Sequence, residues 1–391
     1  MIEGLRDSRW LSRAQIDDAD WNARVAADCG GSAGYMHTAY LDAVAPGWGA
    51  LLFADGALFP IWPRGWGPLR QCRQPWFVQH LAVLSPSSPP SFPPSSPPSS
   101  PPSSPPSSLL SPSPPPSLSL SALLSPSSPP SPSPSSLLSP SSPVSSSPSS
   151  PLSPSPPVSS GHHRSSAREL AERLTHARLA VLKGASLLEF QVDEPPPLAD
   201  QVPAGWQAIG RTTYRFPIDS ADSQATRAGY SGHHRRLIRP IDGLHYGKTN
   251  NPDPFLRLFV AQVAGKAGLT AEQIRSLGRL LKSLLHNQHA DLWTLMREQE
   301  LLCGCVLLRS GDRLVYQLAS SSGASMQMGG MHRLVDHILH RPEYRGLTLD
   351  FEGSDLTGLQ RFYSGFGARP HTYTRWLLDK RHPILKRVQR I

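Results

Sequence analysis

The alternation of apolar and polar side chains predicts regular structure along most of the chain. Short apolar runs rich in aromatic side chains predict strands at residues 57–63 and 75–83. Helical spacing of apolar positions predicts helices at 167–183 and 223–239, the second of which ends before Pro240. The first part of the chain therefore mixes strands and helices.

Two further helices follow before the pattern changes. Residues 252–268 open with a proline and close with glycines, which is typical of a helix. Thr270 and Gln273 then have the spacing of a capping box. The apolar residues behind this box recur at helical spacing: Ile274, Leu277, Leu281, Leu284 and Leu285.

The C-terminal part has the clearest pattern. Three apolar runs predict successive strands, the second and third joined by a turn at 310–312. The predicted order is strands at 291–297, 301–309 and 313–320, a helix at 326–340, a strand at 346–351, a helix at 356–368 and a strand at 372–378. This order predicts an α/β (α+β layered) fold, with a mixed sheet covered by helices.

Residues 85–160 interrupt the pattern, because they consist almost wholly of serine, proline and a few leucines. Proline lacks the backbone donor that helices and sheets need, so we expect a disordered insertion rich in polyproline II. A strand pattern precedes it and a helix pattern follows it, which favours insertion into an existing domain. A linker, a ligand of proline-binding modules, a neutral repeat and a frame error all stay open.

The net charge of +9 comes from residues 161–391. Residues 1–84 carry nearly equal numbers of acidic and basic side chains, and the Ser/Pro tract carries none. A basic surplus attracts a polyanion such as tRNA or the phosphates of a nucleotide-bearing cofactor. A solvated basic surface is the alternative interpretation.

The four cysteines, Cys29, Cys72, Cys303 and Cys305, form neither a disulfide framework nor a C-x-x-C motif. The first residues mix both charge signs where a signal peptide needs an apolar core, and no stretch is long and apolar enough to span a membrane. We therefore expect a cytoplasmic protein with no membrane span.

Three segments together resemble a known family: HTAYLDAVAPGWGALL (37–52), YSGHHRRLIRP (230–240) and LDFEGSDLTGLQRFYSGFGA (349–368). The order of elements from Thr270 onward is similar to the GNAT acyltransferase fold, and the three segments resemble its FemAB-like branch. This resemblance implies two GNAT-like lobes. The predicted N-terminal lobe is 1–84 plus 161–222, the insertion is 85–160, and the C-terminal lobe is 223–391.

The resemblance implies a donor site where the third strand of the C-terminal lobe runs into a helix. A Gly- and Ser-rich turn at a helix N-terminus presents backbone N–H groups to phosphate. His332 departs from the signature of the family, which has a small residue there. A plain turn is the alternative. The predicted cradle is Ser322, Gly323, Gln327, Gly329 and Gly330.

Two acidic residues and a tyrosine are the predicted catalytic groups. The resemblance implies that Tyr363 protonates the leaving group, the alternative being a tyrosine packed between Phe362 and Phe366. Asp350 and Glu352 share one face of a strand end, where a carboxylate could deprotonate an amine, and Glu352 is the first choice. Alternatively, Glu352, Ser354 and Asp355 cap the next helix.

A basic cluster lies in the second segment, with His234, Arg235 and Arg239 as candidate substrate-binding residues. Arg235 and Arg239 would share a helix face suited to an anion, or form a solvated basic face. No metal site is expected. The adjacent pairs His162/His163 and His233/His234 diverge, and Cys303 and Cys305 fit better as small core residues.

The sequence thus predicts an N-acyltransferase that moves an acyl group from acyl-CoA to a small-molecule or peptide amine. Two alternatives stay open. One is an aminoacyl-tRNA-dependent peptidyltransferase acting on cell-wall peptide, which the FemAB-like resemblance implies. The other is a non-catalytic protein that binds RNA or a phosphorylated metabolite.

Overall fold

The computed structural model describes residues 8–65, 70–86, 167–176, 185–219, 222–353 and 356–381. All of these belong to one compact unit. Apart from its first two residues, the predicted insertion at 85–160 lies outside them, as do Ser354 and Asp355. No helix in these ranges is both long and apolar enough to cross a lipid bilayer.

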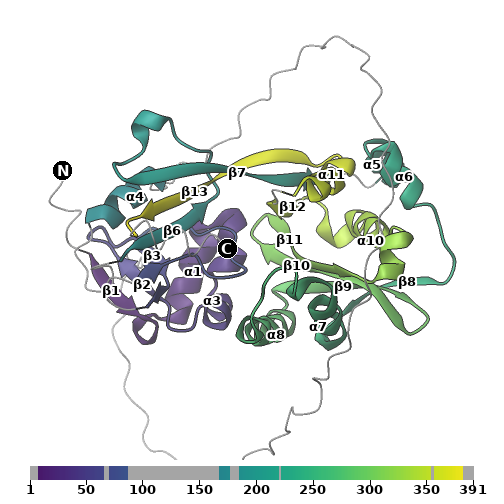
Figure 1. Cartoon of the computed structure of the whole chain (residues 1–391), viewed down its shortest axis with the longest axis horizontal. Coiled ribbons are helices and arrows are strands. Elements are labelled where there is room, and N and C mark those ends of the chain that lie inside the picture. Colours follow the sequence, from purple (N-terminus) through teal and green to yellow (C-terminus); the bar gives the residue numbers. More distant parts are fainter. Residues whose placement is uncertain are drawn as a thin grey trace, which may run out of the picture. The chain divides into compact units, whose positions relative to one another are not determined.

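Eleven α-helices lie in the described ranges (Figure 1), namely α1 (Asp18–Asp28), α2 (Ala33–Met36), α3 (Thr38–Val44), α4 (Ala167–His176), α5 (Ser223–Ala228), α6 (Gly232–Leu237), α7 (Asp253–Phe259), α8 (Ala271–His286), α9 (Gly323–Gln327), α10 (Gly330–Leu339) and α11 (Thr357–Gly365). The end of α7 continues into a π-helical turn at Val260–Ala264. The predicted capping box is confirmed, because Thr270 and Gln273 exchange hydrogen bonds at the start of α8.

The strands in these ranges are β1 (Arg9–Ser12), β2 (Gly49–Leu52), β3 (Leu58–Ile61), β4 (Pro63–Arg64), β5 (Gln71–Cys72), β6 (Leu187–Val192), β7 (Trp206–Pro217), β8 (Leu244–Thr249), β9 (Ala290–Arg297), β10 (Glu300–Ser310), β11 (Arg313–Ser321), β12 (Thr348–Gly353) and β13 (Arg369–Asp379). β1, β2 and β3 form an antiparallel sheet. The other ten form a mixed sheet in the order β4-β5-β6-β13-β7-β12-β11-β10-β9-β8.

The long strands β7 and β13 hold the large sheet together. They run antiparallel side by side, and β13 also pairs with β6 on its other edge (Figure 1). β13 comes from the predicted C-terminal lobe and lies between β6 and β7, which both come from the predicted N-terminal lobe, so strands of both predicted lobes form one continuous sheet. The α/β fold class is confirmed, whereas the lobe boundary at residues 222 and 223 stays a prediction.

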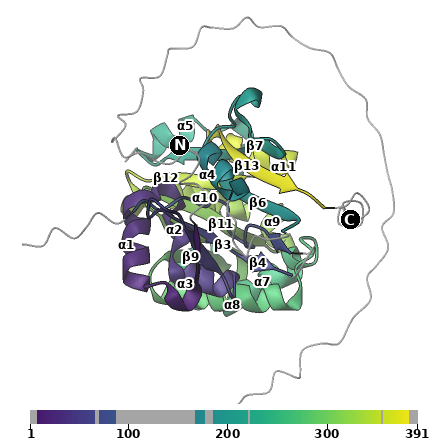
Figure 2. The same cartoon turned by 90° about the vertical axis from the view of Figure 1, so that its left-hand side faces the viewer.

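Two apolar cores cover the faces of the sheet. Along β10, Val306 and Leu308 belong to the first core, whereas Cys305 and Leu307 belong to the second. This is the two-residue alternation of a strand with both faces covered. The first core also contains the contact between α3 and α8 (Figure 2). Cys303 and Cys305 are fully buried in the second core, as small core residues.

Several predicted elements differ from the structure. The strand predicted at 57–63 is divided into β3 and β4, which belong to different sheets. Residues 75–83 form no strand. Phe77 has a left-handed φ of 64°, and the Gln74 side chain, instead of a neighbouring strand, donates to two carbonyls of this segment. The predicted helix at 223–239 is two helices, because Ser231 caps a new one. The predicted helix at 326–340 is likewise divided by Gly329, whose φ is 69°.

Candidate active site

The parallel strands β11 and β12 pair only at the ends where they begin. Their register runs from Arg313 opposite Thr348 to Val315 opposite Asp350 and stops there. Beyond this point the residues of both strands line a cavity of about 1190 Å³. The rest of its wall comes from α6, the π-helical turn, the junction of α9 with α10, and α11. We call this cavity the cleft, and pockets of this size accommodate cofactor-sized ligands.

Glu352 lies in the wall of the cleft at the end of β12. Its φ of 57° is left-handed, a conformation that costs free energy for any residue with a Cβ and that occurs often at functional sites. Tyr35, in α2, donates a hydrogen bond to its Oε1. Burial raises the pKa of Glu352 to about 8; the Tyr35 hydrogen bond opposes the rise and the charge of Asp350 adds to it.

Tyr363, in α11, also lines the cleft and is 5% exposed. Its ring stacks on Phe351 at 4.8 Å between centroids and lies 5.9 Å from Tyr214. Burial, and next the charge of Glu352, raise the pKa of its hydroxyl. The hydroxyl therefore stays protonated at neutral pH, so Tyr363 both packs as an aromatic core residue and can donate a proton into the cleft.

Asp350 is not among the residues that line the cleft, unlike Glu352. It is 1% exposed, and its carboxylate accepts hydrogen bonds from the Thr213 hydroxyl at 2.5 Å and from Arg215 Nε at 2.8 Å. It also accepts from the backbone N–H of Glu352 at 3.0 Å. These bonds hold the end of β12 in place, so we assign Asp350 a structural role in place of the predicted catalytic one.

The predicted phosphate cradle is divided between the cleft and its surroundings. Gly329 and Gly330 line the cleft where α10 begins, and the first N–H groups of a helix have no partner within it. Ser322 caps α9 instead, and neither Gly323 nor Gln327 is among the lining residues. The part of the cradle that reaches the cleft is therefore the start of α10.

His234 joins two of the segments that carry the family resemblance. It is 3% exposed, and its Nε2 donates to the carbonyl of Phe362 at 2.9 Å. Because that carbonyl can only accept, Nδ1 is the acceptor for the Ser231 hydroxyl at 2.9 Å in the neutral ring. Burial lowers the pKa of His234, which favours this neutral form. His234 therefore holds α6 against α11 and forms part of the cleft wall.

The predicted pairing of Arg235 with Arg239 on one helix face is wrong, because α6 ends at Leu237 and Arg239 lies beyond it. Both side chains are exposed and neither is among the residues that line the cleft. Arg235 donates to the carbonyl of Ala228 at 3.3 Å. A binding role for these two arginines stays a prediction.

Replacing Gly365 by alanine should destabilise the protein by about 1–3 kcal/mol, because it overpacks a closed contact. A Cβ at this position would lie 1.9 Å from His234 Cε1, and the two hydrogen bonds of His234 prevent the ring from moving away. Gly358→Ala is the matched control in the same helix, since nothing lies within 4 Å of its Cβ. Urea denaturation of both variants tests this, and equal stabilities would contradict it.

Sequence reasoning missed several residues of the site. Tyr35 precedes the first family segment by two positions, and Tyr40 lies inside it. Gln317 is a polar residue within the apolar run of β11, a signal that could have been noticed. His332, which the sequence showed only as a departure from the family signature, lines the cleft 4.5 Å from the ring of His234, and burial lowers its pKa to about 4.

No group of three or more His, Cys, Asp or Glu side chains in the described ranges is arranged to hold a metal ion. The contact of His332 with His234 is edge to face, at an interplanar angle of 71°.

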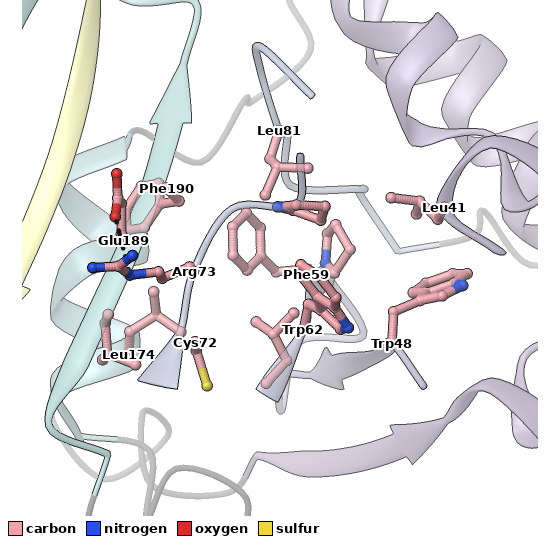
Figure 3. Close-up of a pocket in the computed structure, with 14 residues that line it drawn as sticks. Leu41, Trp48, Phe59, Trp62, Cys72, Arg73, Leu81, Leu174, Glu189 and Phe190 are labelled. Atoms are coloured by element: carbon pink, nitrogen blue, oxygen red, sulfur yellow. Dashed lines mark ion pairs between the residues drawn. The ribbon is translucent and has the colours of Figure 1, made fainter. Parts of the chain in front are cut away.

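A second cavity lies in the first core (Figure 3), and neither Glu352 nor Tyr363 is among the residues that line it. Apolar side chains such as Trp48, Phe59 and Phe190 line it, and the ion pair of Arg73 with Glu189, at 3.9 Å, lies at its edge. Its volume of about 20 Å³ has room for roughly one water molecule. It is a packing gap, not a ligand site.

Comparison with known proteins shows the fold of the chain. No protein-family model and no curated protein sequence matches it. The crystal structure of FemX has a TM-score of 0.52 to this structure at 11% identity, covering 94% of this chain and 96% of FemX. A conserved protein of unknown function from Bacteroides thetaiotaomicron VPI-5482 has a TM-score of 0.48 at 9% identity, covering 93% of this chain and 97% of that one.

A tandem GNAT protein from the clavulanic acid biosynthesis pathway has a TM-score of 0.47 at 10% identity, covering 96% of this chain and 99% of that chain. At such identities the likeness concerns the fold alone. The chain shares the fold of FemX, which confirms the predicted FemAB-like GNAT fold.

Proposed function

We propose that this protein is an N-acyltransferase that moves an acyl group from acyl-CoA to an amine. The observation that carries the proposal is the Glu352 carboxyl group, held in a strained backbone conformation in the cleft wall with a pKa of about 8. A general base works best when its pKa lies near the working pH. Tyr363, protonated and in the same cleft, supplies the matching acid.

The reaction uses these two groups in turn. The lone pair of the amine attacks the acyl carbon of the thioester, and the carboxylate of Glu352 takes a proton from the amine nitrogen. The carbon–sulfur bond then breaks, and the Tyr363 hydroxyl gives its proton to the departing sulfur. Tyr35 holds Oε1 of Glu352, so Oε2 is the oxygen that remains to accept the proton.

The start of α10 is the proposed binding site for the phosphates of the donor. Its first N–H groups and the positive end of its helix dipole both favour an anion. Gly329 and Gly330 carry no side chain that would cover these groups. Lys266 and Arg361 also line the cleft and add positive charge.

Aminoacyl-tRNA is a second candidate donor. The observation that favours it is the exposed run of Arg235, Arg236 and Arg239, which continues from the cleft-lining residues of α6. Such a run offers more positive charge than the phosphates of CoA need and suits a longer polyanion. The strong salt dependence of polyanion binding separates the two donors.

Ligand-dependent thermal unfolding tests the proposal. Acetyl-CoA, longer acyl-CoAs, free CoA and bulk aminoacylated tRNA are compared at low and moderate salt. We expect CoA compounds to raise the Tm at both salt concentrations, because a ligand that binds only the folded state stabilises it. Release of free thiol on adding an amine then establishes transfer. A response to tRNA alone that fades steeply with salt would favour the second donor.

A further inference from the structure

Gln317 occupies an irregular position in the wall of the cleft. In the β10–β11 pair Val306 lies opposite Leu318 and Leu307 opposite Tyr316, so Gln317 is the extra residue of a β-bulge. Bulges redirect side chains and are frequent beside active sites. Gln317 is 8% exposed and lines the same cleft as Glu352 and Tyr363.

Its carboxamide oxygen is buried but unsatisfied. Oε1 of Gln317 has no hydrogen-bond partner in the part of the chain that the structure describes. A buried acceptor without a partner costs about 1–3 kcal/mol, and native proteins contain few of them. An acceptor of this kind in a substrate cleft favours a ligand that brings a donor.

The hydrogen bonds of Nε2 fix the orientation of the Gln317 carboxamide. Nε2 of Gln317 donates to the carbonyl of Phe77 at 3.1 Å and to the hydroxyl of Tyr40, which itself donates to the same carbonyl. Because a carbonyl only accepts, the amide nitrogen must face it, and Oε1 cannot exchange places with Nε2. Phe77 has a left-handed φ of 64°, a strained conformation at the residue that supplies this carbonyl.

We propose that Gln317 positions the amine acceptor and selects primary amines. This inference rests on the proposed acyl transfer and names the class of acceptor that the cleft takes. A neutral primary amine has two N–H bonds and one lone pair. Oε1 of Gln317 accepts one N–H, Glu352 takes the proton of the other, and the lone pair is left to attack the acyl carbon.

A secondary amine provides the matched comparison. It has a single N–H bond, which is the one that Glu352 must remove during transfer. No N–H bond then remains to donate to Oε1 of Gln317, so this oxygen still lacks a hydrogen-bond partner in the transition state. Sites that hydrogen-bond a substrate group discriminate strongly against analogues that lack it. Gln317 is thus a positioning residue, and its effect depends on the number of N–H bonds.

The test measures kcat/KM with acetyl-CoA for two substrate pairs: butylamine with N-methylbutylamine, and alanine with N-methylalanine. For the wild-type protein we expect a preference of about 10- to 100-fold for each primary amine. Gln317→Met has a similar shape and lacks the carboxamide, so it should lose most of this preference. Gln262→Met, in the same cleft wall, is the control that should keep it.

The outcomes separate the two proposals. Equal rates for primary and secondary amines in the wild-type protein would overturn the role of Gln317 and leave acyl transfer in place. A preference for primary amines that persists in Gln317→Met would also overturn the role of Gln317 and leave acyl transfer in place. If no amine releases thiol from any acyl-CoA, the proposed function fails and this inference fails with it. The wild-type comparison needs no variant, so misfolding of Gln317→Met cannot hide the result.

Discussion

Replacing Glu352 by glutamine should reduce acyl transfer by about 10²- to 10⁴-fold, the usual contribution of a general base. Glutamine keeps the shape of the side chain and can still accept the hydrogen bond of Tyr35, but it cannot take a proton from the amine. Donor binding should change little, because the proposed phosphate site lies at the start of α10. Steady-state kinetics and thermal shifts with acyl-CoA measure the two effects separately.

The same residue sets the pH dependence that we expect. Transfer needs the carboxylate form, and the pKa of Glu352 is raised to about 8, so kcat/KM should rise with pH up to about that value. Stability changes in the opposite direction. The folded state holds this proton more tightly than the unfolded state, so the contribution of Glu352 to stability is fully present below the ordinary pKa of 4.5 and is lost as pH rises through about 8.

Glu298 provides the matched control for Glu352. It also has a left-handed φ, 54°, but it is exposed in the turn between β9 and β10. Glu298→Gln should leave both the rate and the pH profile unchanged. If Glu352→Gln kept more than a tenth of the wild-type rate and the same pH profile, Glu352 would not be the base.

Replacing Asp350 by alanine should cost about 3–5 kcal/mol of stability, the usual effect of removing one partner from a buried ion pair. Arg215 and Arg313, both largely buried, would then share the carboxylate of Asp193, at 2.5 Å and 2.6 Å, and Arg313 would keep a longer contact of 4.0 Å with Asp312. The hydrogen bond that Asp350 accepts from the backbone of Glu352 would also be lost. Urea denaturation measures the change as a lower midpoint.

Glu172→Ala is the control for Asp350→Ala. It removes an ion pair with Arg168 at 3.0 Å, in which the two side chains are 38% and 51% exposed. Ion pairs this exposed contribute little, so the free energy of unfolding should change by no more than about 0.5 kcal/mol. An Asp350→Ala protein as stable as the wild type but without activity would return Asp350 to the catalytic groups.

The C-terminal elements were predictable because their signals are local. The strands β9, β10 and β11 and the helices that follow show their period within ten or so residues, and the family segment that contains Glu352 and Tyr363 lies among them. The N-terminal part was not predictable from local signals, because β6 and β7 are defined by pairing with β13, far along the chain. Sequence period does not reveal such partners.

Only the part of the candidate site that the C-terminal segments contribute could be predicted, because the rest depends on contacts with distant segments. Glu352 and Tyr363 were identified, whereas Tyr35 is 317 positions from the carboxylate that it contacts. Gln317 could be noticed as a polar residue in an apolar strand, but its role depends on Phe77, 240 positions away. Such contacts between distant segments have no signature in either segment alone.

The position of β13 in the sheet also bears on how the protein is made. β13 lies between β6 and β7, so each of these strands has an open edge until the last strand leaves the ribosome. Roughly 150 residues separate the end of β7 from the start of β13, about 8–30 s of translation at ordinary speed. Open strand edges recruit other chains. The nascent chain is therefore most exposed to aggregation in this interval, when chaperones would matter most.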